Sequence, residues 1–397
     1  MKPLNISYNS YRSCKRVNSY KSYNTEVTKV ETIETFYPFS PTYMKLLKLL
    51  KLLKLLKLFK LKLFPLFALV LIGCAAPERK FPDIVWPPPP ADPKIKFVET
   101  LQSNLDVEDT GFIASLLGEE VKDVLRKPYG VAVDSEDRVY VSDLGRVFVF
   151  DRKNKKLSFI GQDSAGSLRI PTGIAISQDG KVYVADTAGE KIFVYDKNGN
   201  FFNAIGQAKE FDAPSGVALD EKRHKLYVAD AKKHNVRAYS LDGKLLQTIG
   251  KRGNKAGEFN FPTNIAVDSS GNIYVIDTGN FRIQVFDSAG KHLKMFGEIG
   301  DRPGNFVRPK GIAVDSEDHI YIVDSAFNNF QIFDKEGRLL LFVGDGGTYY
   351  GQFTVPAGIA IDEEDKIYVV DQLNRRVQVF QYLSEKWKKK QAEQPKK

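Results

Sequence analysis

Six aspartates recur at one position of a repeating pattern, and carboxylates can serve both as metal ligands and as catalytic groups. The six are Asp143, Asp186, Asp230, Asp277, Asp324 and Asp371. Carboxylates gathered from unlike repeats at one point could hold a divalent cation or act as general acid and base. Here every repeat carries one aspartate, and no asymmetric set stands out. We therefore interpret them as strand-end groups that accept N–H bonds from turns.

A basic or amide residue follows each of these aspartates at a short distance. Five positions after five of the aspartates come Lys191, Asn235, Arg282, Asn329 and Arg376, and Arg146 comes three positions after the first. We expect an aspartate with an arginine or lysine at this spacing to form an ion pair inside its own repeat. Arg282 and Arg376, like the six aspartates, are therefore assigned to the structure of the repeat.

The four histidines are dispersed, although histidine is the commonest metal ligand among side chains. They are His224, His234, His292 and His319. Two of them fall in the first predicted turn of a repeat, one falls in the next turn, and one opens an outer strand. Because successive turns of an antiparallel meander lie on opposite faces, the four cannot converge. We predict no metal site, no catalytic residue and no cofactor other than a covalent lipid.

Residues 262–297 show the element that positions these side chains. Apolar runs of strand length at 265–267, 273–276, 283–286 and 293–296 are separated by Ser-Ser-Gly-Asn, Thr-Gly-Asn and Ser-Ala-Gly. Short runs rich in Ile, Val, Tyr and Phe between such turn residues predict antiparallel strands. A four-stranded meander of this size buries too little apolar surface to be stable alone.

The same pattern occurs six times along the chain. Its marker, Pro-x-[Gly/Asn]-[Ile/Val]-Ala-aliphatic, begins at Pro128, Pro171, Pro214, Pro262, Pro309 and Pro356. The intervals are 43, 43, 48, 47 and 47 residues, and repeats of 40–50 residues with four strands each are typical of propeller blades. The sequence thus predicts an all-β fold, a six-bladed β-propeller.

The repeats resemble the NHL-repeat family from residue 128 to about residue 382. The motif is fullest in the fourth and sixth repeats, at Asn280, Arg282, Ile283, Gln284, Val285 and Phe286, and at Asn374, Arg376, Val377, Gln378, Val379 and Phe380. The resemblance implies four-stranded NHL-type blades, and it extends to bacterial NHL-type lipoproteins. Relatives among the propeller lyases use several histidines around a central zinc or a catalytic histidine near the axis, and this chain offers neither.

The ring needs a strand from outside the repeats. The sixth repeat has only three strands, whereas an unassigned strand at 94–101 precedes the first repeat. Pairing this strand into blade six removes two open edges at once, so we predict Phe97 and Val98 in the sixth blade and a propeller domain over 95–382. A weak helical spacing at 110–127 predicts a short helix covering one face.

The N-terminal region resembles a bacterial lipoprotein signal. A lysine-rich start at Met44 leads into an apolar run at 63–73 of the length of a signal-peptide core. Leu71-Ile72-Gly73-Cys74 then resembles a lipobox, which implies lipid attachment to Cys74 and a signal peptide over 44–73. The alternative is a buried free cysteine at the end of an anchor helix. Residues 1–43 are polar, and we expect them to be disordered or outside the natural product.

Two further segments flank the predicted domain. Residues 74–94 are rich in proline, which favours an extended spacer between membrane and domain; the alternative is a loop packed on the domain through Trp86. Residues 383–397 are rich in lysine, and we expect a basic disordered tail.

The formal charge of +9 belongs to the two ends of the chain. Residues 1–94 hold 16 Lys and Arg against 6 Asp and Glu, and residues 383–397 hold 6 against 2, whereas residues 95–382 hold 36 against 41. A mildly acidic body argues against a phosphate-binding surface for nucleic acid. Both cysteines, Cys14 and Cys74, lie before the body, so no disulfide is expected within it.

The loops before repeats four, five and six are long, and we expect them on the same face as the turns between second and third strands. The candidate partner-binding residues on this face are Phe281, Phe327, Asn328, Tyr349, Tyr350 and Leu373. Aromatic residues on a rigid loop face suit partner binding. We expect a monomeric outer-membrane lipoprotein facing the periplasm or cell surface, which binds an envelope protein or carbohydrate. The alternative is a lactonase- or lyase-type enzyme with a metal in the central channel.

Overall fold

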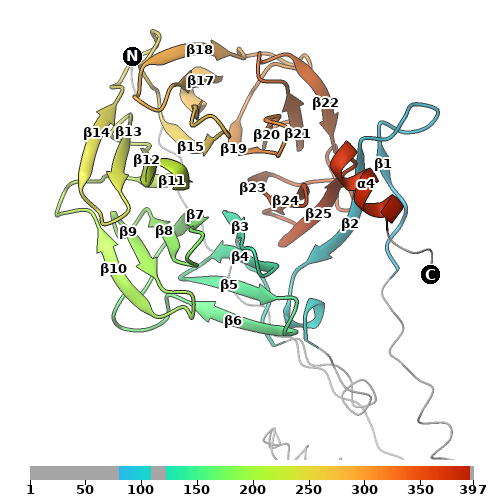
Figure 1. The fold of residues 1–397 in the computed structure, drawn as a ribbon, viewed down its shortest axis with the longest axis horizontal. Coiled ribbons are helices and arrows are strands. Elements are labelled where there is room, and N and C mark those ends of the chain that lie inside the picture. Colours follow the sequence, from blue (N-terminus) through green and yellow to red (C-terminus); the bar gives the residue numbers. More distant parts are fainter. Residues whose placement is uncertain (1–79, 109–121, 394–397) are drawn as a thin grey trace, which may run out of the picture. The chain divides into compact units, whose positions relative to one another are not determined.

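The computed structural model describes residues 80–108 and 122–393, which form six antiparallel sheets arranged as the blades of a ring (Figure 1). The predicted six-bladed β-propeller is therefore confirmed. The predicted signal peptide at 44–73, the lipidation residue Cys74 and most of the predicted helix at 110–127 lie outside the described residues.

Each of the first five blades is a meander of four consecutive strands. Blade one consists of β3 (Val131–Val133), β4 (Arg138–Asp143), β5 (Arg146–Asp151) and β6 (Lys156–Ile160). Blade two consists of β7 (Pro171–Ile176), β8 (Val182–Asp186), β9 (Lys191–Tyr195) and β10 (Phe201–Ile205). Blade three consists of β11 (Pro214–Asp220), β12 (Lys225–Asp230), β13 (Asn235–Ser240) and β14 (Leu245–Ile249). Blade four consists of β15 (Pro262–Val267), β16 (Ile273–Asp277), β17 (Arg282–Phe286) and β18 (His292–Phe296). Blade five consists of β19 (Pro309–Val314), β20 (Ile320–Asp324), β21 (Asn329–Phe333) and β22 (Leu339–Val343).

Blade six is built from both ends of the described chain. Its inner strands are β23 (Pro356–Ile361), β24 (Lys366–Asp371) and β25 (Arg376–Tyr382), and the early strand β2 (Ile95–Leu101) pairs with β25. Phe97 faces Phe380 across this pair and is buried. The predicted closure of blade six by Phe97 and Val98 is therefore confirmed.

The proline-rich segment is partly packed on this blade. A two-residue strand, β1 (Val85–Trp86), adds a fifth strand beside β2. The Trp86 ring contacts the Phe380 ring edge to face, with centroids 5.6 Å apart. Over residues 80–94 the packed-loop alternative is therefore right and the free spacer is wrong, because burying Trp86 on blade six stabilises the segment.

The predicted disordered tail is wrong for residues 385–393, which form the helix α4 (Glu385–Glu393). Ser384 accepts a hydrogen bond from Trp387 N and donates one to the buried Asp365. Lys390 also pairs with Glu364 of blade six at 2.5 Å. Two of the lysines that suggested disorder thus dock the helix on blade six, Lys390 through Glu364 and Lys386 through the Glu363 carbonyl. None of the helices in the described segments has the length and apolar character needed to span a bilayer.

The hydrophobic core lies between neighbouring blades. One cluster joins Tyr274 and Ile283 of blade four to Ile312 and Ile320 of blade five, and the others repeat this arrangement around the ring. The tyrosine of each second strand is buried, with its hydroxyl directed in blade four toward Asp268 at 3.2 Å. Each blade therefore depends on its neighbour for burial of its apolar face, which is why six copies are stable where one is not.

Candidate functional site: loop face and channel mouth

The recurring aspartates hold the loop that leads into their own blade. Asp277 is fully buried and accepts hydrogen bonds from Asn260 N at 2.6 Å, Asn280 Nδ2 at 2.8 Å and Gln284 Nε2 at 3.0 Å. Arg282 Nε adds an ion pair at 2.9 Å. The carboxylate is thus occupied by the protein itself, and the other five aspartates accept loop N–H bonds in the same way.

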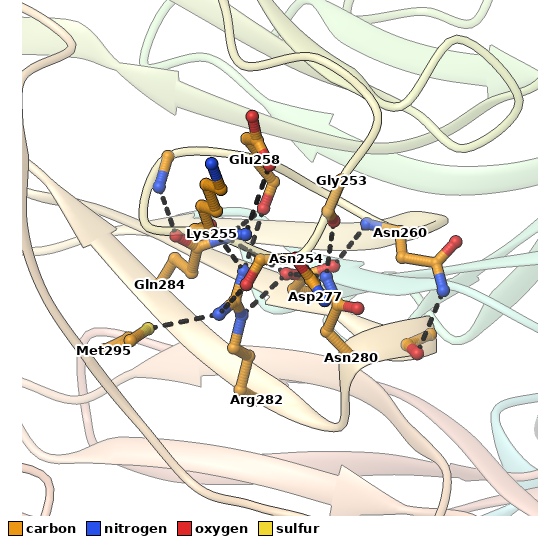
Figure 2. Close-up of polar contacts among 12 residues, drawn as sticks. Gly253, Asn254, Lys255, Glu258, Asn260, Asp277, Asn280, Arg282, Gln284 and Met295 are labelled. Carbon is orange, nitrogen blue, oxygen red and sulfur yellow. Dashed lines mark hydrogen bonds and ion pairs between the residues drawn. The ribbon is translucent and has the colours of Figure 1, made fainter.

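Arg282 also holds the loop before blade four, through an arrangement that we call a brace: a buried arginine paired with the blade aspartate and bonded to loop carbonyls (Figure 2). Its Nη1 donates to the Asn254 carbonyl at 2.8 Å, and its Nη2 donates to the carbonyls of Lys255 at 2.8 Å and Glu258 at 3.0 Å. Gln284 donates to the Glu258 carbonyl at 2.7 Å. The buried arginine therefore fixes three carbonyls of one loop, which holds the loop in a single conformation.

Blade six repeats the brace around the loop that carries Tyr349. Arg376 pairs with Asp371 at 2.8 Å and donates to the carbonyls of Tyr349 at 2.7 Å and Gln352 at 2.9 Å. Burial raises the pKa of Asp371, opposed by hydrogen bonds from Thr354 N and other groups that include Arg376. The side chain of Tyr349 thus lies on a loop whose backbone is fixed by hydrogen bonds from the buried Arg376.

The sequence suggested that the ion pair between the aspartate and the following basic residue recurs from blade to blade. The structure does not repeat it in every blade. Arg146 pairs with Asp123 at 3.2 Å rather than with Asp143, although it lies opposite Asp143 in the strand pair as Arg282 lies opposite Asp277. No ion pair joins Lys191 to its aspartate among the described residues. In blade five, Asn329 is too short to reach the loop carbonyls, and its Oδ1 is buried with no partner in the described part of the chain.

The loops before the inner strands and the hairpins between second and third strands form one surface, which we call the loop face. Asn280, in such a hairpin, donates to Gly253 of the preceding loop at 2.9 Å, and Asn374 does the same to Gly347. Both groups of loops therefore lie at the same end of the blades, as the alternation of turns requires.

Two of the six candidate binding residues are prominent on the loop face. The side chains of Tyr349 and Leu373 are exposed, at 78% and 58%. Tyr350 instead packs against the rings of Phe97 at 5.2 Å and Phe81 at 5.5 Å between centroids. Tyr350 therefore helps to hold the N-terminal segment, a contact that could not be seen while that segment was read as a spacer.

The other three candidates have backbone or packing roles. Phe281 has a left-handed backbone, with φ of 55°, and packs against the cluster between blades four and five. Asn328 also has positive φ and accepts a hydrogen bond from Val355 N at 2.8 Å. Phe327 is half-buried beside it. These positions combine turn geometry with partial exposure, so residue type alone could not separate them from free side chains.

Sequence reasoning missed further exposed apolar residues on the same face. Ile299, exposed at 65%, and Val307 lie in the loop before blade five, Phe261 lies before blade four, and Leu144 lies in the first hairpin. For Phe261, Val307 and Leu144 a signal was available, because each stands next to a buried repeat position yet varies in type between repeats. With Tyr349 and Leu373 they give the loop face a scattered apolar character.

The inner strands enclose a cavity of about 230 Å³ along the ring axis. Its lining is glycine and aliphatic, apart from Asn264, which replaces the glycine found at this position of the other five repeats. Those glycines allow the inner strands of neighbouring blades to approach closely, since a Cβ on Gly130 would lie 2.1 Å from the Thr172 carbonyl oxygen. No group of three acidic, histidine or cysteine residues suited to a metal ion occurs in the described segments.

The loop-face end of this cavity is basic, which sequence reasoning also missed. Lys310 and Tyr129 directly precede the glycines of β19 and the first blade, and Lys310 Nζ lies 5.7 Å from the centroid of the Tyr129 ring. Burial, followed by the charges of Arg308 and Lys127, lowers the pKa of Lys310 to about 8. Comparing the residue after each motif proline would have revealed this pair, because the other four are Thr, Ser, Thr and Ala.

Comparison with known families and structures agrees with this architecture. A family described as "6-bladed beta-propeller" matches residues 168–249 and 316–392, and the NHL repeat matches residues 259–286. None of the curated proteins compared with the chain matches it significantly.

Similar solved structures share the fold at low sequence identity. A structural genomics protein of unknown function from Bacteroides thetaiotaomicron has a TM-score of 0.52 and 17% identity, over 71% of this chain and 76% of that one. An auxiliary nutrient binding protein from the same organism has a TM-score of 0.52 and 14% identity, over 66% and 71%. Virginiamycin B lyase from Staphylococcus aureus has a TM-score of 0.50 and 16% identity, over 72% and 99%. This chain thus contains an NHL repeat and is a six-bladed β-propeller.

Proposed function

We propose that this protein is a non-enzymatic binding module that recognises a protein or carbohydrate of the cell envelope through its loop face. The observation that carries the proposal is the combination of exposed apolar side chains with buried braces. Tyr349 is 78% exposed while Arg376 fixes its backbone carbonyl. A loop whose backbone is already fixed loses little further conformational freedom when a partner covers it.

The enzyme alternative has less support in the geometry. A lactonase- or lyase-type site in the channel would need convergent acids, histidines or a metal, whereas the cavity lining is aliphatic apart from Asn264. The buried aspartates that might have served are bonded to their own loops. Fold likeness does not choose between the two, since propellers serve both binding and catalysis, as the nutrient binding protein and the lyase illustrate.

Anchoring to the membrane through a lipid on Cys74 completes the proposal. It rests on the basic start, the apolar run and the Leu71-Ile72-Gly73-Cys74 sequence, and it puts the propeller at the outer membrane, facing the periplasm or the cell surface, as a monomer. Mass spectrometry of the mature protein tests it: a chain starting at a lipid-modified Cys74 is expected. An intact chain with a free thiol at Cys74 would remove the anchor.

Site-specific photo-crosslinking in the native envelope tests the binding face. A photoreactive residue at position 349 or 373 should yield a discrete adduct, and its mass and composition identify a protein or a carbohydrate. The same group at Asn198, in an exposed turn on the opposite face, is the matched control. Equal adducts from both faces, or none from positions 349 and 373, would refute partner binding at the loop face.

A further inference from the structure

The side chains of Lys310 and Tyr129 meet over the start of blade six. Lys310 belongs to blade five and Tyr129 to blade one, and the residue at their position in the intervening blade is the buried Ala357. The Gly358 N–H donates to the Tyr129 carbonyl at 2.8 Å, so the inner strands of blades six and one are in direct contact. Because Ala357 is short, the two long side chains reach each other across it, with 5.7 Å between Nζ and the ring centroid.

The positive charges at this mouth are not compensated. Lys127 and Arg308 directly precede the motif prolines of blades one and five. In the described part of the chain, neither they nor Lys310 form an ion pair. The carboxylates at these strand ends accept backbone N–H bonds and form no ion pair with these cations: Asp143 accepts Lys127 N at 2.7 Å, and Asp324 accepts Arg308 N at 3.0 Å.

A partly buried ammonium without a partner is unfavourable, because it has lost hydration and gained no counter-charge. That cost is the reason for the lowered pKa of Lys310, to which Arg308 and Lys127 add repulsion. The Tyr129 ring gives only a weak cation–π contact. An anion bound here would offset both the desolvation and the repulsion, and the cavity between the inner strands lies beyond it.

We infer that the channel mouth is a binding site for an oxyanion, a carboxylate or phosphate group, held by Lys310 with Arg308 and Lys127. The group is either a small free anion or the head of a longer molecule whose chain enters the cavity. This site is separate from partner capture at Tyr349 and Leu373, so either can fail without the other.

Calorimetric titration of the full-length protein with acetate, hexanoate and inorganic phosphate tests the inference. The key variant is Lys310→Thr, which the fold should tolerate because Thr172 and Thr263 occupy this position in other blades. The control is Lys335→Thr, at an exposed turn of blade five on the opposite face. We expect saturable binding of at least one anion at pH 7, at least tenfold weaker in Lys310→Thr and within twofold of the parent in Lys335→Thr.

The comparison of ligands and pH identifies the ligand and the group responsible. Tighter binding of hexanoate than acetate assigns the site to an acid with an apolar tail, and equal binding assigns it to a free anion. Affinity should fall between pH 7 and pH 9.5, as the Lys310 ammonium beside Arg308, Lys127 and Tyr129 loses its proton. Absence of saturable binding for all three anions, or undiminished affinity in Lys310→Thr, would overturn the inference.

Discussion

The side-chain amide of Gln372, in the last blade, donates a hydrogen bond of 3.1 Å to the carbonyl oxygen of Pro128, in the first. The same position in blade four is Thr278, which donates to the Pro309 carbonyl of blade five at 3.0 Å. The junction between the first and last blades thus uses the same side-chain contact as a junction inside the ring. Closure is therefore secured at the centre of the ring by Gln372 and at its rim by β2.

Replacing Gln372 by alanine should lower the free energy of unfolding by about 1–3 kcal/mol, because the buried Pro128 carbonyl would lose its donor. Urea unfolding of Gln372→Ala and of the parent protein measures the difference. The exposed Gln178, in a turn of blade two, provides the control, and Gln178→Ala should change the stability little. Equal effects of the two variants would show that the closing bond adds no stability.

Arg376→Met should destabilise the protein by about 3–5 kcal/mol, because removing one partner of a buried pair leaves Asp371 as an uncompensated charge. Three backbone and carboxylate contacts are lost with it. Amide exchange should also accelerate in the loop 346–355. The control is Arg338→Met, at an exposed pair with Asp334, where a loss of about 0–1 kcal/mol is expected. Unchanged exchange in the Tyr349 loop would argue against the brace.

Phe97→Ala should cost about 3–5 kcal/mol, since the ring is buried against Phe380 and Tyr350. Deletion of residues 94–101 should abolish the cooperative unfolding transition altogether, because it opens the edge of β25. Thermal unfolding followed by circular dichroism measures both. Phe202→Ala, at an exposed ring of β10, is the control and should be nearly neutral. A cooperative, unshifted transition in the deletion variant would be incompatible with closure by β2.

His319 should make stability fall as pH rises. Its Nδ1 lies 2.9 Å from Asp315, and this hydrogen bond raises the pKa of His319 above 6.5. The folded state therefore binds the proton more tightly, so the stabilisation is fully present below pH 6.5 and is lost as pH rises through the raised pKa. In urea unfolding, His319→Gln should be destabilised relative to the parent more at pH 5.5 than at pH 9.

His292 should make the stability change with pH in the opposite direction, and the same urea unfolding measures it. Burial, and then the charge of Arg282, lowers the pKa of His292, so the unfolded state binds the proton more tightly. The parent protein therefore loses stability as pH falls. Relative to the parent, the free energy of unfolding of His292→Gln should be higher at pH 5.5 than at pH 9. Parallel pH profiles for the two histidine variants would contradict both assignments.

The repeat made the architecture predictable from sequence. Pro262, Tyr274 and Asp277 belong to a pattern that recurs six times, so strand order, blade number and the missing outer strand follow from counting and from the cost of open edges. Lys191 and Arg146 mark the limit of that reasoning. A repeated spacing does not guarantee a repeated ion pair where the hairpin length or the side chain changes.

What could not be predicted depends on contacts between distant segments. Tyr350 meets Phe81 and Phe97, some 250 residues earlier in the chain, and α4 docks through lysines whose partners lie in blade six. The contact of Lys310 with Tyr129 joins blade five to blade one across the inner strand of blade six. Such contacts have no periodic signal, and they appear only once the ring has brought the segments together.

The register of β2 against β25 also determines how the ring responds to mechanical force. Ile95 pairs with Tyr382 and Leu101 with Val377, so the two outward-leading chain segments leave the same end of this strand pair. Tension applied between these segments first reaches the docked α4 and the β1–β2 pair, and then separates the rungs of β2 and β25 one after another. Pulling would therefore begin to open the ring at blade six.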